Sequence, residues 1–368
     1  MARALARARR ASGRTFPNPP VGAIVLRGDR VLGAGETRPA GGPHAEVVAI
    51  EQARRRHGAR ALVGATLVVT LEPCCHHGRT PPCTDAILAA GVRRVWVGQR
   101  DPNPKVRGNG LRQLRRAGVS LRTGVREAEC REQHRGFLSV QQRGRPWVAL
   151  KLAATLDGRI ATARGESRWI TGPAARAAVH RLRDVADAVM VGSGTARSDD
   201  PELSVRRDGR RVRMPVRVLV DASLRVSEAA RLFRDEDAAR TWLLTRRGHP
   251  SARLARLTAR GARALIVPAR GGHLDLARAL ARLAREGLTH VFVEGGGGLA
   301  AALLRAGLVD ELHWFVAPSL LGGDARPALG PLAARRLAER IPLELVEVRR
   351  LGPDLYVRGL LSAPGGPA

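Results

Sequence analysis

Short apolar runs alternate with amphipathic segments through the first 143 residues. The runs have the length of short buried strands, and the segments between them fit the apolar face of a helix. The strands predicted are 21–26, 66–71 and 95–97, and the helices predicted are 45–56, 84–90 and 110–118. Strands that alternate with helices indicate an α/β domain with a mostly parallel sheet.

A second series begins after the turn residues "RGRP" at 143–146. The strands predicted there are 147–155, 188–193, 216–221, 241–245, 264–268, 290–295 and 311–318, and the helices are 174–184, 252–260, 274–286 and 298–306. This alternation indicates a second α/β domain. We therefore place the two domains at 1–143 and 147–362, with a loose tail at 363–368.

The ends of the chain and of one helix carry further signals. The N-terminal "MARALARARRASGRTFPNPP" predicts a first helix with arginines on its solvent side, and it lacks the apolar core of about 7–15 residues of a secretory signal. Thr84 is expected to cap the helix at 84–90, and Gly91 is expected to end it. No apolar run reaches the length of about 18 residues that predicts a membrane span.

The net charge of +30 raises the possibility of nucleic-acid binding. All but two of the 63 basic residues are arginine, the exceptions being Lys105 and Lys151, and they are spread along the whole chain. Aromatic residues make up only 3% of the chain, so platforms for stacking bases are scarce. The charge therefore indicates a compositional bias and nonspecific attraction to polyanions, and no specific nucleic-acid partner is expected.

Four cysteines do not form a disulfide framework in a chain of 368 residues. Three of them lie within ten residues, and Cys130 stands alone as an ordinary thiol. This usage suits a reducing cytoplasm, where thiolates are free to bind a metal.

The segment 71–84, "LEPCCHHGRTPPCT", supplies several possible metal ligands. About thirty residues earlier, His44 and Glu46 form an "HAE" motif at the start of a predicted helix. An H-x-E motif followed by P-C-x-x-C is the signature of zinc deaminases, in which one imidazole and two thiolates leave a zinc position open and a carboxylate carries protons. The possible ligands are Cys74, Cys75, His76, His77 and Cys83.

The match to that signature is incomplete, because its second cysteine falls on His77 and the next cysteine is Cys83. From the spacing alone, His77 and Cys83 compete as the third ligand. A closed structural site of His44, Cys74, His77 and Cys83 is the alternative. The acidic Glu46 beside His44 favours the catalytic interpretation.

Two glycine-rich turns follow predicted strands in the second domain, within 189–201 and 291–307. A strand, a glycine turn and a helix N-terminus together favour a bound phosphate. Two such turns in one domain, without a Walker lysine, indicate a dinucleotide. The Rossmann G-x-G-x-x-G pattern does not fit, so a doubly wound dehydrogenase is disfavoured.

Several strings resemble the deaminase half of the bifunctional riboflavin-biosynthesis deaminase/reductase family: "TFPNPPVGAIV", "HAEVVAI", "ATLVVTLEPCCHHGRTPPC" and "DPNPKVRGNGL". The resemblance implies a cytidine-deaminase-like three-layer domain with His44, Cys74 and Cys83 as zinc ligands and Glu46 as the proton carrier. It implies that Cys75 is not a ligand. The residues implied on the substrate side are Asn18, His76 and Arg79.

The strings "KLAATLDGRIATARGESRWITG", "GSGTARSDDPELSVR" and "VEGGGGLAAALLRAGLVDEL" are similar to the reductase half of the same family, whose fold resembles dihydrofolate reductase. The resemblance implies NADPH as the cofactor. The cofactor residues implied are Ala153, Trp169, Thr195, Asp199, Gly296, Gly297, Gly298, Leu299 and Ala300. The substrate residues implied are Ser167, Arg183, Leu203, Arg206 and Glu294. Lys151 and Asp157 lie in the matching segment without an assigned role.

The resemblance implies two consecutive steps of riboflavin biosynthesis on a phosphorylated pyrimidine, catalysed by a homo-oligomeric (dimeric or tetrameric) cytoplasmic enzyme. It covers about residues 12–362. Two rival interpretations remain from the residues alone. One is a zinc deaminase of another nucleobase or of tRNA with an unrelated second domain. The other is an arginine-rich nucleic-acid binder with a structural zinc.

Overall fold

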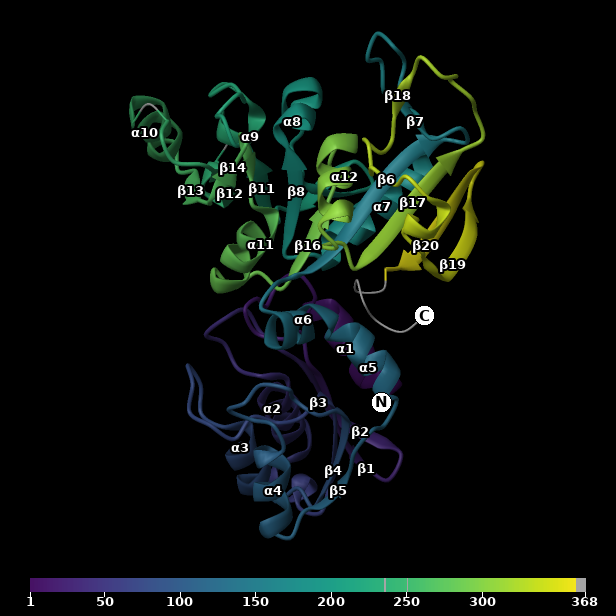
Figure 1. Ribbon diagram of the computed structural model, residues 1–368. Coiled ribbons are helices and arrows are strands. Elements are labelled where there is room, and N and C mark those ends of the chain that lie inside the picture. The colour runs from purple at the N-terminus through teal and green to yellow at the C-terminus, as the bar shows by residue number, and fades with distance from the viewer. Residues whose placement is uncertain (235, 250, 362–368) are drawn as a thin grey trace. The chain divides into compact units, whose positions relative to one another are not determined.

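The computed structural model describes residues 1–234, 236–249 and 251–361. The chain divides into two compact units, Met1–Gly144 and Arg145–Ala368 (Figure 1). The predicted tail at 363–368 lies outside the described residues.

The first unit is built on a five-stranded sheet of order β2-β1-β3-β4-β5. The strand β1 pairs antiparallel with both β2 and β3, whereas β3, β4 and β5 run parallel. As expected, most strands of this sheet share one direction, which β2 has in common with β3, β4 and β5, and β1 alone among them runs the opposite way; β1 and β2 form a hairpin that closes at Gly28, with φ of 57°. The strands are β1 (Gly22–Arg27), β2 (Arg30–Glu36), β3 (Thr66–Leu71), β4 (Arg94–Gln99) and β5 (Ser120–Arg122).

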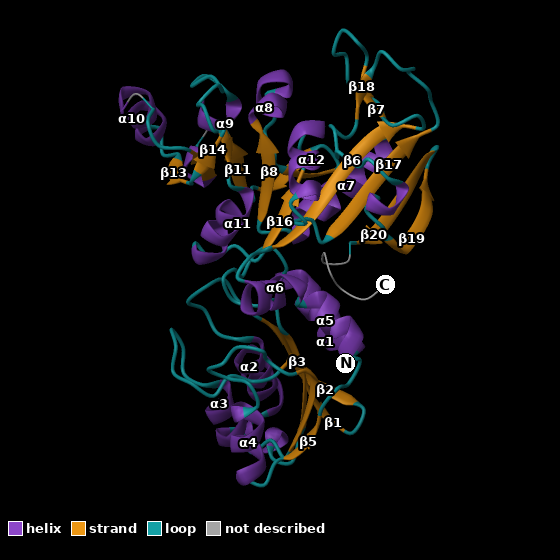
Figure 2. Ribbon diagram, in the orientation of Figure 1, coloured by secondary structure: helices purple, strands orange, loops and turns teal. Residues whose placement is uncertain are grey.

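Helices pack against this sheet and share its apolar core (Figure 2). The first helix buries Ala4, Leu5 and Ala8 and exposes its arginines at positions 3, 9 and 10, as the sequence predicted. The helices of the unit are α1 (Ala2–Ala11), α2 (Ala45–His57), η1 (Ala59–Leu62), α3 (Cys83–Ala89), α4 (Asn109–Arg116), α5 (Glu127–Gln133) and α6 (Arg135–Arg143).

The close approach of α2 to β2 requires glycine. A Cβ atom added at Gly33 would lie 2.2 Å from the carbonyl oxygen of Ala49, and one at Gly35 would lie 2.2 Å from that of Ala45. The backbone of the strand therefore touches the helix directly. This contact fixes the N-terminal end of α2, where His44 and Glu46 lie.

The second unit is built on a nine-stranded sheet of order β13-β12-β11-β8-β16-β6-β17-β20-β19. Its first seven strands in this order run parallel, and β20 runs antiparallel to both of its neighbours, β17 and β19. The sheet strands are β6 (Trp147–Thr155), β8 (Ala188–Gly192), β11 (Val216–Val220), β12 (Thr241–Thr245), β13 (Arg263–Ile266), β16 (His290–Val293), β17 (Glu311–Ala317), β19 (Glu344–Leu351) and β20 (Asp354–Leu360).

Short two-stranded ribbons and helices complete this unit. The ribbon strands are β7 (Arg159–Ala161), β9 (Val205–Arg207), β10 (Arg210–Arg213), β14 (Ala269–Arg270), β15 (His273–Leu274) and β18 (Arg326–Pro327). The helices are α7 (Pro173–Val185), α8 (Ser193–Asp199), α9 (Arg231–Arg234), η2 (Ala238–Arg240), α10 (Ser251–Ala259), α11 (Leu276–Arg285), α12 (Gly297–Arg305) and η3 (Leu337–Glu339).

All seven strands and all four helices predicted for the second unit are present, with ends shifted by at most two residues. One helix start was wrong: α3 begins at Cys83 and is preceded by Pro82, so Thr84 does not cap it. Instead, the Thr84 hydroxyl donates a hydrogen bond to Gln113 at 3.1 Å. The helix ends just before Gly91, which has a φ of 72°, as expected.

Candidate zinc centre and cofactor cavity

Three elements of the first unit bring two thiols and one imidazole together. His44 is the residue before α2, Cys74 follows β3 after two residues, and Cys83 is the first residue of α3. The ligand atoms of these residues all lie within 4.8 Å of one another. The Nδ1 atom of His44 is 3.3 Å from the Cys83 sulfur and 3.5 Å from the Cys74 sulfur, so this nitrogen faces the thiols.

The chemistry of this donor set fits zinc. One imidazole nitrogen and two sulfurs are the ligands of catalytic zinc sites with an open fourth position. A hydrogen bond from Cys83 lowers the pKa of Cys74 to about 4, and the Cys83 backbone N–H also donates to the Cys74 sulfur at 3.4 Å. The Cys74 side chain is therefore a thiolate at neutral pH, which is the form that binds metal.

Glu46 lies in the first turn of α2, two residues after His44, and its side chain is buried. Burial raises the pKa of Glu46 to about 7. A carboxyl group with a pKa near neutrality both accepts and donates protons readily, as a general acid and base requires.

The remaining predicted residues of this site lie on loops. His76 is half-buried, and both His77 and Arg79 are exposed. Among the described residues, the potential metal ligands that cluster here are His44, Cys74 and Cys83, and His77 is not one of them. The Cys75 sulfur lies 3.9 Å from the carbonyl oxygen of Lys105.

Asn18 is half-buried in a turn that backbone and side-chain groups close. Its N–H donates to the carbonyl oxygen of Thr15 at 2.9 Å, and the Thr15 hydroxyl donates back to the carbonyl oxygen of Asn18 at 3.0 Å. This turn precedes β1 in the chain.

Sequence reasoning missed a supporting carboxylate, Glu72, just before the Pro-Cys pair. Its buried side chain accepts backbone N–H groups from Asp101 at 3.2 Å, Gly108 at 3.1 Å and Leu111 at 3.3 Å. It thereby fastens the loop after β4 to the segment that carries Cys74. The signal was present in the string "LEPCC", but only the fold shows which N–H groups the carboxylate binds.

The second unit contains a cavity of about 1390 Å³ at the carboxyl ends of its parallel strands. Almost all of the predicted reductase residues line it. They are Ala153, Ser167, Trp169, Arg183, Thr195, Asp199, Leu203, Arg206, Glu294, Gly296, Gly297, Gly298 and Leu299. Ala300 is fully buried and does not line the cavity.

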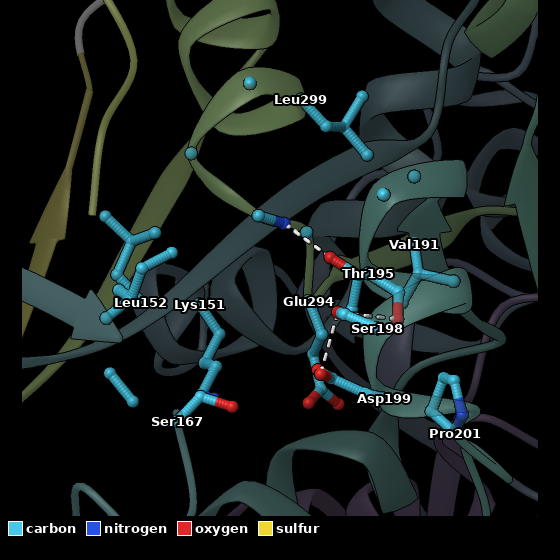
Figure 3. Close-up of a pocket in the computed structure, with 18 of the residues that line it drawn as sticks. Lys151, Leu152, Ser167, Val191, Thr195, Ser198, Asp199, Pro201, Glu294 and Leu299 are labelled. Atoms are coloured by element: carbon cyan, nitrogen blue, oxygen red, sulfur yellow. Dashed lines mark hydrogen bonds between the residues drawn. The ribbon is translucent and has the colours of Figure 1, made fainter. Parts of the chain in front are cut away.

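The two glycine-rich turns meet in this cavity. The Gly296 N–H donates to the Thr195 hydroxyl at 2.9 Å, which joins the loop before α12 to α8 (Figure 3). A Cβ atom added at Gly194 or Gly298 would meet nothing within 4 Å, so bare backbone faces open space at both turns. Such backbone at a helix N-terminus suits the phosphates of a dinucleotide.

An ion pair and a lysine form the polar wall of the cavity. The Arg183 guanidinium binds both carboxylate oxygens of Glu294 and donates to the carbonyl oxygen of Ser204 at 2.7 Å. Lys151 of β6 lines the same cavity as this pair. Burial lowers the pKa of Lys151, although nearby Glu294 acts in the opposite direction.

Trp169 and Asp157 lie in the segments that resemble the reductase family, but the structure places them differently: Trp169 lines the cavity, whereas Asp157 holds a loop. Trp169 lines the cavity with 71% of its surface exposed, and the Arg176 guanidinium stacks 4.6 Å from its ring centre. Asp157 accepts the backbone N–H groups of Leu321 at 3.1 Å and Gly322 at 2.8 Å, and thus fixes a loop. Hydrogen bonds from the Thr155 hydroxyl and these N–H groups lower the pKa of Asp157 to about 2.

Comparison with known proteins gives a family match for each of the two units. A family model described as the RibD C-terminal domain matches residues 146–357, and one described as the cytidine and deoxycytidylate deaminase zinc-binding region matches residues 1–99. The riboflavin biosynthesis protein RibD of Escherichia coli K12 is 41% identical over 366 residues, covering 96% of each chain. The chain belongs to the RibD family.

Other RibD proteins are similar over the same length. RibD of Aquifex aeolicus is 40% identical over 354 residues, covering 96% of this chain and 95% of that protein. The solved structure of Acinetobacter baumannii RibD superimposes with a TM-score of 0.87 at 35% identity, covering 98% of this chain and 97% of that one.

A Thermotoga maritima structure is named a diaminohydroxyphosphoribosylaminopyrimidine deaminase/5-amino-6-(5-phosphoribosylamino)uracil reductase. It superimposes with a TM-score of 0.84 at 34% identity, covering 98% of this chain and 97% of that one.

Membership of the RibD family confirms several expectations from the sequence. The α/β fold class is confirmed, with a cytidine-deaminase-like domain followed by the RibD reductase domain. The expectation of a deaminase and a reductase of riboflavin biosynthesis, with zinc in the first and NADPH in the second, is confirmed as well. No helix among the described residues is long and apolar enough to cross a bilayer.

Proposed function

We propose that this chain catalyses two consecutive steps. The first is hydrolytic deamination of 2,5-diamino-6-ribosylamino-4(3H)-pyrimidinone 5′-phosphate. The second is reduction by NADPH to 5-amino-6-ribitylamino-2,4(1H,3H)-pyrimidinedione 5′-phosphate. The observation that carries the proposal is the presence in one chain of both the three-ligand cluster beside a buried glutamate and the glycine-lined cavity that includes a half-buried lysine.

In the first step, His44, Cys74 and Cys83 hold zinc. Zinc, when bound, supplies the Lewis acidity that activates water for attack on the ring carbon bearing the 2-amino group. Glu46 takes a proton from the water and delivers it to the departing ammonia, a role that its pKa near neutrality permits. Asn18, His76 and Arg79 contact the substrate from the surrounding loops.

In the second step, the glycine turns bind the phosphates of the cofactor, together with Thr195 and Asp199. Ala153, Trp169 and the backbone of 296–300 are the other cofactor contacts proposed. When bound, NADPH supplies the hydride for the ribosyl carbon attached to nitrogen. Ser167, Leu203, Arg206 and the Arg183–Glu294 pair contact the substrate.

The reduction also needs one proton, because opening the ribosyl ring leaves an oxygen that ends as a hydroxyl group. Lys151 is a suitable donor. It lines the cavity beside Glu294, and no hydrogen-bond partner for its ammonium group is present in the described part of the chain. The lowered pKa caused by its burial makes the ammonium a stronger acid.

The test is a single assay with purified protein, zinc, NADPH and the diaminopyrimidinone substrate. Ammonia release and the loss of NADPH absorbance are followed together. We expect ammonia to appear without NADPH, and absorbance to fall only after deamination or when the deaminated intermediate is supplied. Ammonia release without any NADPH oxidation would contradict the second half of the proposal.

We also propose that the protein is a homo-oligomer, a dimer or tetramer. The support is an apolar face on β17, β20 and β19. On these strands, Trp314 and Val316 are half-buried, whereas Leu345 and Val348 are 62% and 59% exposed. Large exposed apolar patches mark protein–protein contacts. A reducing compartment such as the cytoplasm suits the free thiols of the zinc site.

A further inference from the structure

Thr80 lies in the loop between the two cysteines of the zinc cluster, and the sequence pattern gives it no role. It is half-buried in the loop that also carries His76 and Arg79. Its hydroxyl oxygen lies 3.5 Å from the Nε2 atom of His44. Among the described residues, this is the hydrogen-bond contact of that nitrogen, because the other ring nitrogen faces the two sulfurs. The contact therefore joins the loop to the ligand that precedes α2.

The placement of the ring sets the direction of this hydrogen bond. A metal bound by the Nδ1 atom of His44 takes the lone pair of that nitrogen, so the proton of the neutral imidazole lies on Nε2. The Nε2–H group then donates, and the Thr80 hydroxyl oxygen accepts. A ligand histidine that is held in this way keeps both its tautomer and the orientation of its ring, and metal binding depends on both.

Thr80 is held in place by the backbone of the same loop. Its carbonyl oxygen accepts the N–H of Gly78 at 3.2 Å. At the ends of the loop, the Thr84 N–H donates to the carbonyl oxygen of Cys74 at 3.2 Å, and the Cys83 N–H donates to the Cys74 sulfur at 3.4 Å. These bonds fasten the two ends of the loop to each other, and the Thr80 hydroxyl fastens its middle to the histidine ligand.

We propose that Thr80 is a positioning residue of the zinc site: its hydroxyl accepts the Nε2–H of His44 and holds the imidazole in the orientation that zinc binding requires. The inference rests on the proposed zinc site and goes beyond its three ligands. Removing such a partner typically lowers metal affinity by about 10–100-fold. Because 3.5 Å is long for a hydrogen bond, we expect an effect at the lower end of this range.

The experiment measures the zinc affinity of the full-length protein by competition with a chromophoric chelator. It compares Thr80→Val, which replaces the hydroxyl with a methyl group of similar size, with Thr80→Ser, which keeps the hydroxyl. In Thr80→Val we expect the Kd for zinc to rise about tenfold, which corresponds to about 1.4 kcal/mol. In Thr80→Ser the Kd should return close to the wild-type value. An unchanged Kd in Thr80→Val would overturn the proposal.

Thr84→Val is the matched control. The Thr84 hydroxyl, close by in the sequence, donates to Gln113 and to no residue of the zinc cluster. Its removal should therefore leave the Kd for zinc unchanged, even where it lowers the melting temperature. An equal rise of the Kd in Thr80→Val and Thr84→Val would indicate a general loosening of the loop, and the role of Thr80 would then be wrong.

A spectroscopic measurement reports on the hydrogen bond itself. In zinc-loaded protein with isotopically labelled histidine, the Nε2–H proton of His44 should give a slowly exchanging magnetic resonance signal in the wild type and in Thr80→Ser. The signal should be lost to rapid exchange with water in Thr80→Val. A signal that Thr80→Val leaves unchanged would show that the hydroxyl does not hold the ring.

Zinc binding and turnover together separate this inference from the proposed function. If the wild type binds zinc more tightly than Thr80→Val but releases no ammonia from the diaminopyrimidinone, the proposed reaction fails and the role of Thr80 stands. If both proteins bind zinc with the same affinity while ammonia is released, the proposed reaction stands and the role of Thr80 is wrong.

Discussion

Glu46, which is buried, and Lys151, which is half-buried, are the ionisable side chains on which the two proposed reactions depend. Burial shifts the pKa of each toward neutrality, from below for the carboxyl group and from above for the ammonium. Such opposite shifts in pockets are typical of groups that transfer protons. The proton-transfer role of each residue can also be tested separately from ligand binding, because a neutral residue of similar size fits the same space.

Glu46→Gln is expected to keep zinc and abolish deamination. The amide cannot carry the proton, so ammonia release should fall by about 10²–10⁴-fold. Metal analysis should still give one zinc per chain, and reduction of the supplied deaminated intermediate should persist. Glu51→Gln, on the exposed side of the same helix, is the matched control. Deamination by Glu46→Gln at the native rate would show that the role of Glu46 is wrong.

Cys75→Ser is expected to retain one zinc per chain, whereas Cys83→Ser should lose it. The Cys75 sulfur lies against the carbonyl oxygen of Lys105, outside the cluster of ligand atoms that includes Cys83. Replacing one thiolate of a zinc site with a hydroxyl weakens binding strongly. Metal content after dialysis measures the difference, and zinc loss from Cys75→Ser would mean that the wrong thiolate was chosen.

Lys151→Met should slow reduction by about 10²–10⁴-fold while deamination continues. Methionine keeps much of the side-chain volume but has no proton to give. The kcat for reduction of the deaminated intermediate is the measurement, with NADPH binding followed by fluorescence as a check on folding. A normal kcat would assign the proton to solvent or to another group.

At the scale of elements, the apolar pattern predicted strands with continuous apolar runs, such as β3 and β8, and it missed β2, β19 and β20, which lack such runs. β19 exposes most of its residues, so no alternation is visible in "ELVEVRRL". The sequence pattern missed β2 for another reason. Glycines such as those at positions 33 and 35 usually indicate an interruption of a strand. Here they are required because α2 packs directly onto the strand backbone.

The candidate sites divide in a similar way. Spacing alone indicated His44, Cys74 and Glu46 as candidate site residues, but it left His77 and Cys83 as alternatives for the third ligand. The reason is that no local sequence pattern predicts the path of the loop between β3 and α3. In the fold, Cys83 begins α3 and its sulfur turns toward His44, whereas His77 is exposed. Glu72 was missed because its partners are backbone N–H groups distant in sequence.

His134 predicts a pH dependence of the stability of the first unit. It lies between α5 and α6, and its Nε2 atom is 3.1 Å from the Thr70 hydroxyl on β3. Burial lowers the pKa of His134 to about 4. The unfolded chain binds a proton near pH 6.5 and the folded chain only near pH 4, so stability is complete above pH 6.5 and falls as the pH decreases toward 4.

The full effect is about 3 kcal/mol, since each pKa unit corresponds to about 1.4 kcal/mol. Hydrogen exchange of peptides from β3, compared at pH 7.5 and pH 5, measures the part of about 2 kcal/mol that is lost by pH 5, once intrinsic exchange rates are corrected. His134→Gln cannot titrate and should lose less protection on acidification than the wild type. Equal losses in the two proteins would assign the acid sensitivity to other groups, such as the zinc ligands.

At the scale of the whole molecule, the arginine excess and the apolar sheet face have opposite effects on association between copies of the chain. A net charge of +30 favours separation of copies, particularly at low salt. The two terminal strands are locally different: β19 carries two glutamates and two arginines, so its charges balance. In β20, Leu355 and Val357 pair with Val316 and Trp314 of β17, and Val348 of β19 also pairs with Val357.

Paired residues of antiparallel strands point to the same side of a sheet. The opposite side carries Phe315 and Tyr356, which pack against Ala175 and Ala178 of α7. The sheet therefore has one face covered by its own helix and one apolar face that a second copy could bury by sheet-on-sheet packing. An interface built this way would not require the arginines of two copies to approach each other.

The double substitution Leu345→Glu with Val348→Glu should therefore convert the oligomer to monomers without unfolding it. Both side chains are exposed in the isolated chain, so the charges cost little there, whereas four carboxylates would be buried in a symmetric dimer. Light scattering on a sizing column should give a multiple of 39.5 kDa for the wild type and 39.5 kDa for the variant. Val212→Glu, at a residue 50% exposed on β10, is the control and should leave the mass unchanged. A wild type that is monomeric at micromolar concentration, or a variant that keeps the native mass, would contradict an interface on this face.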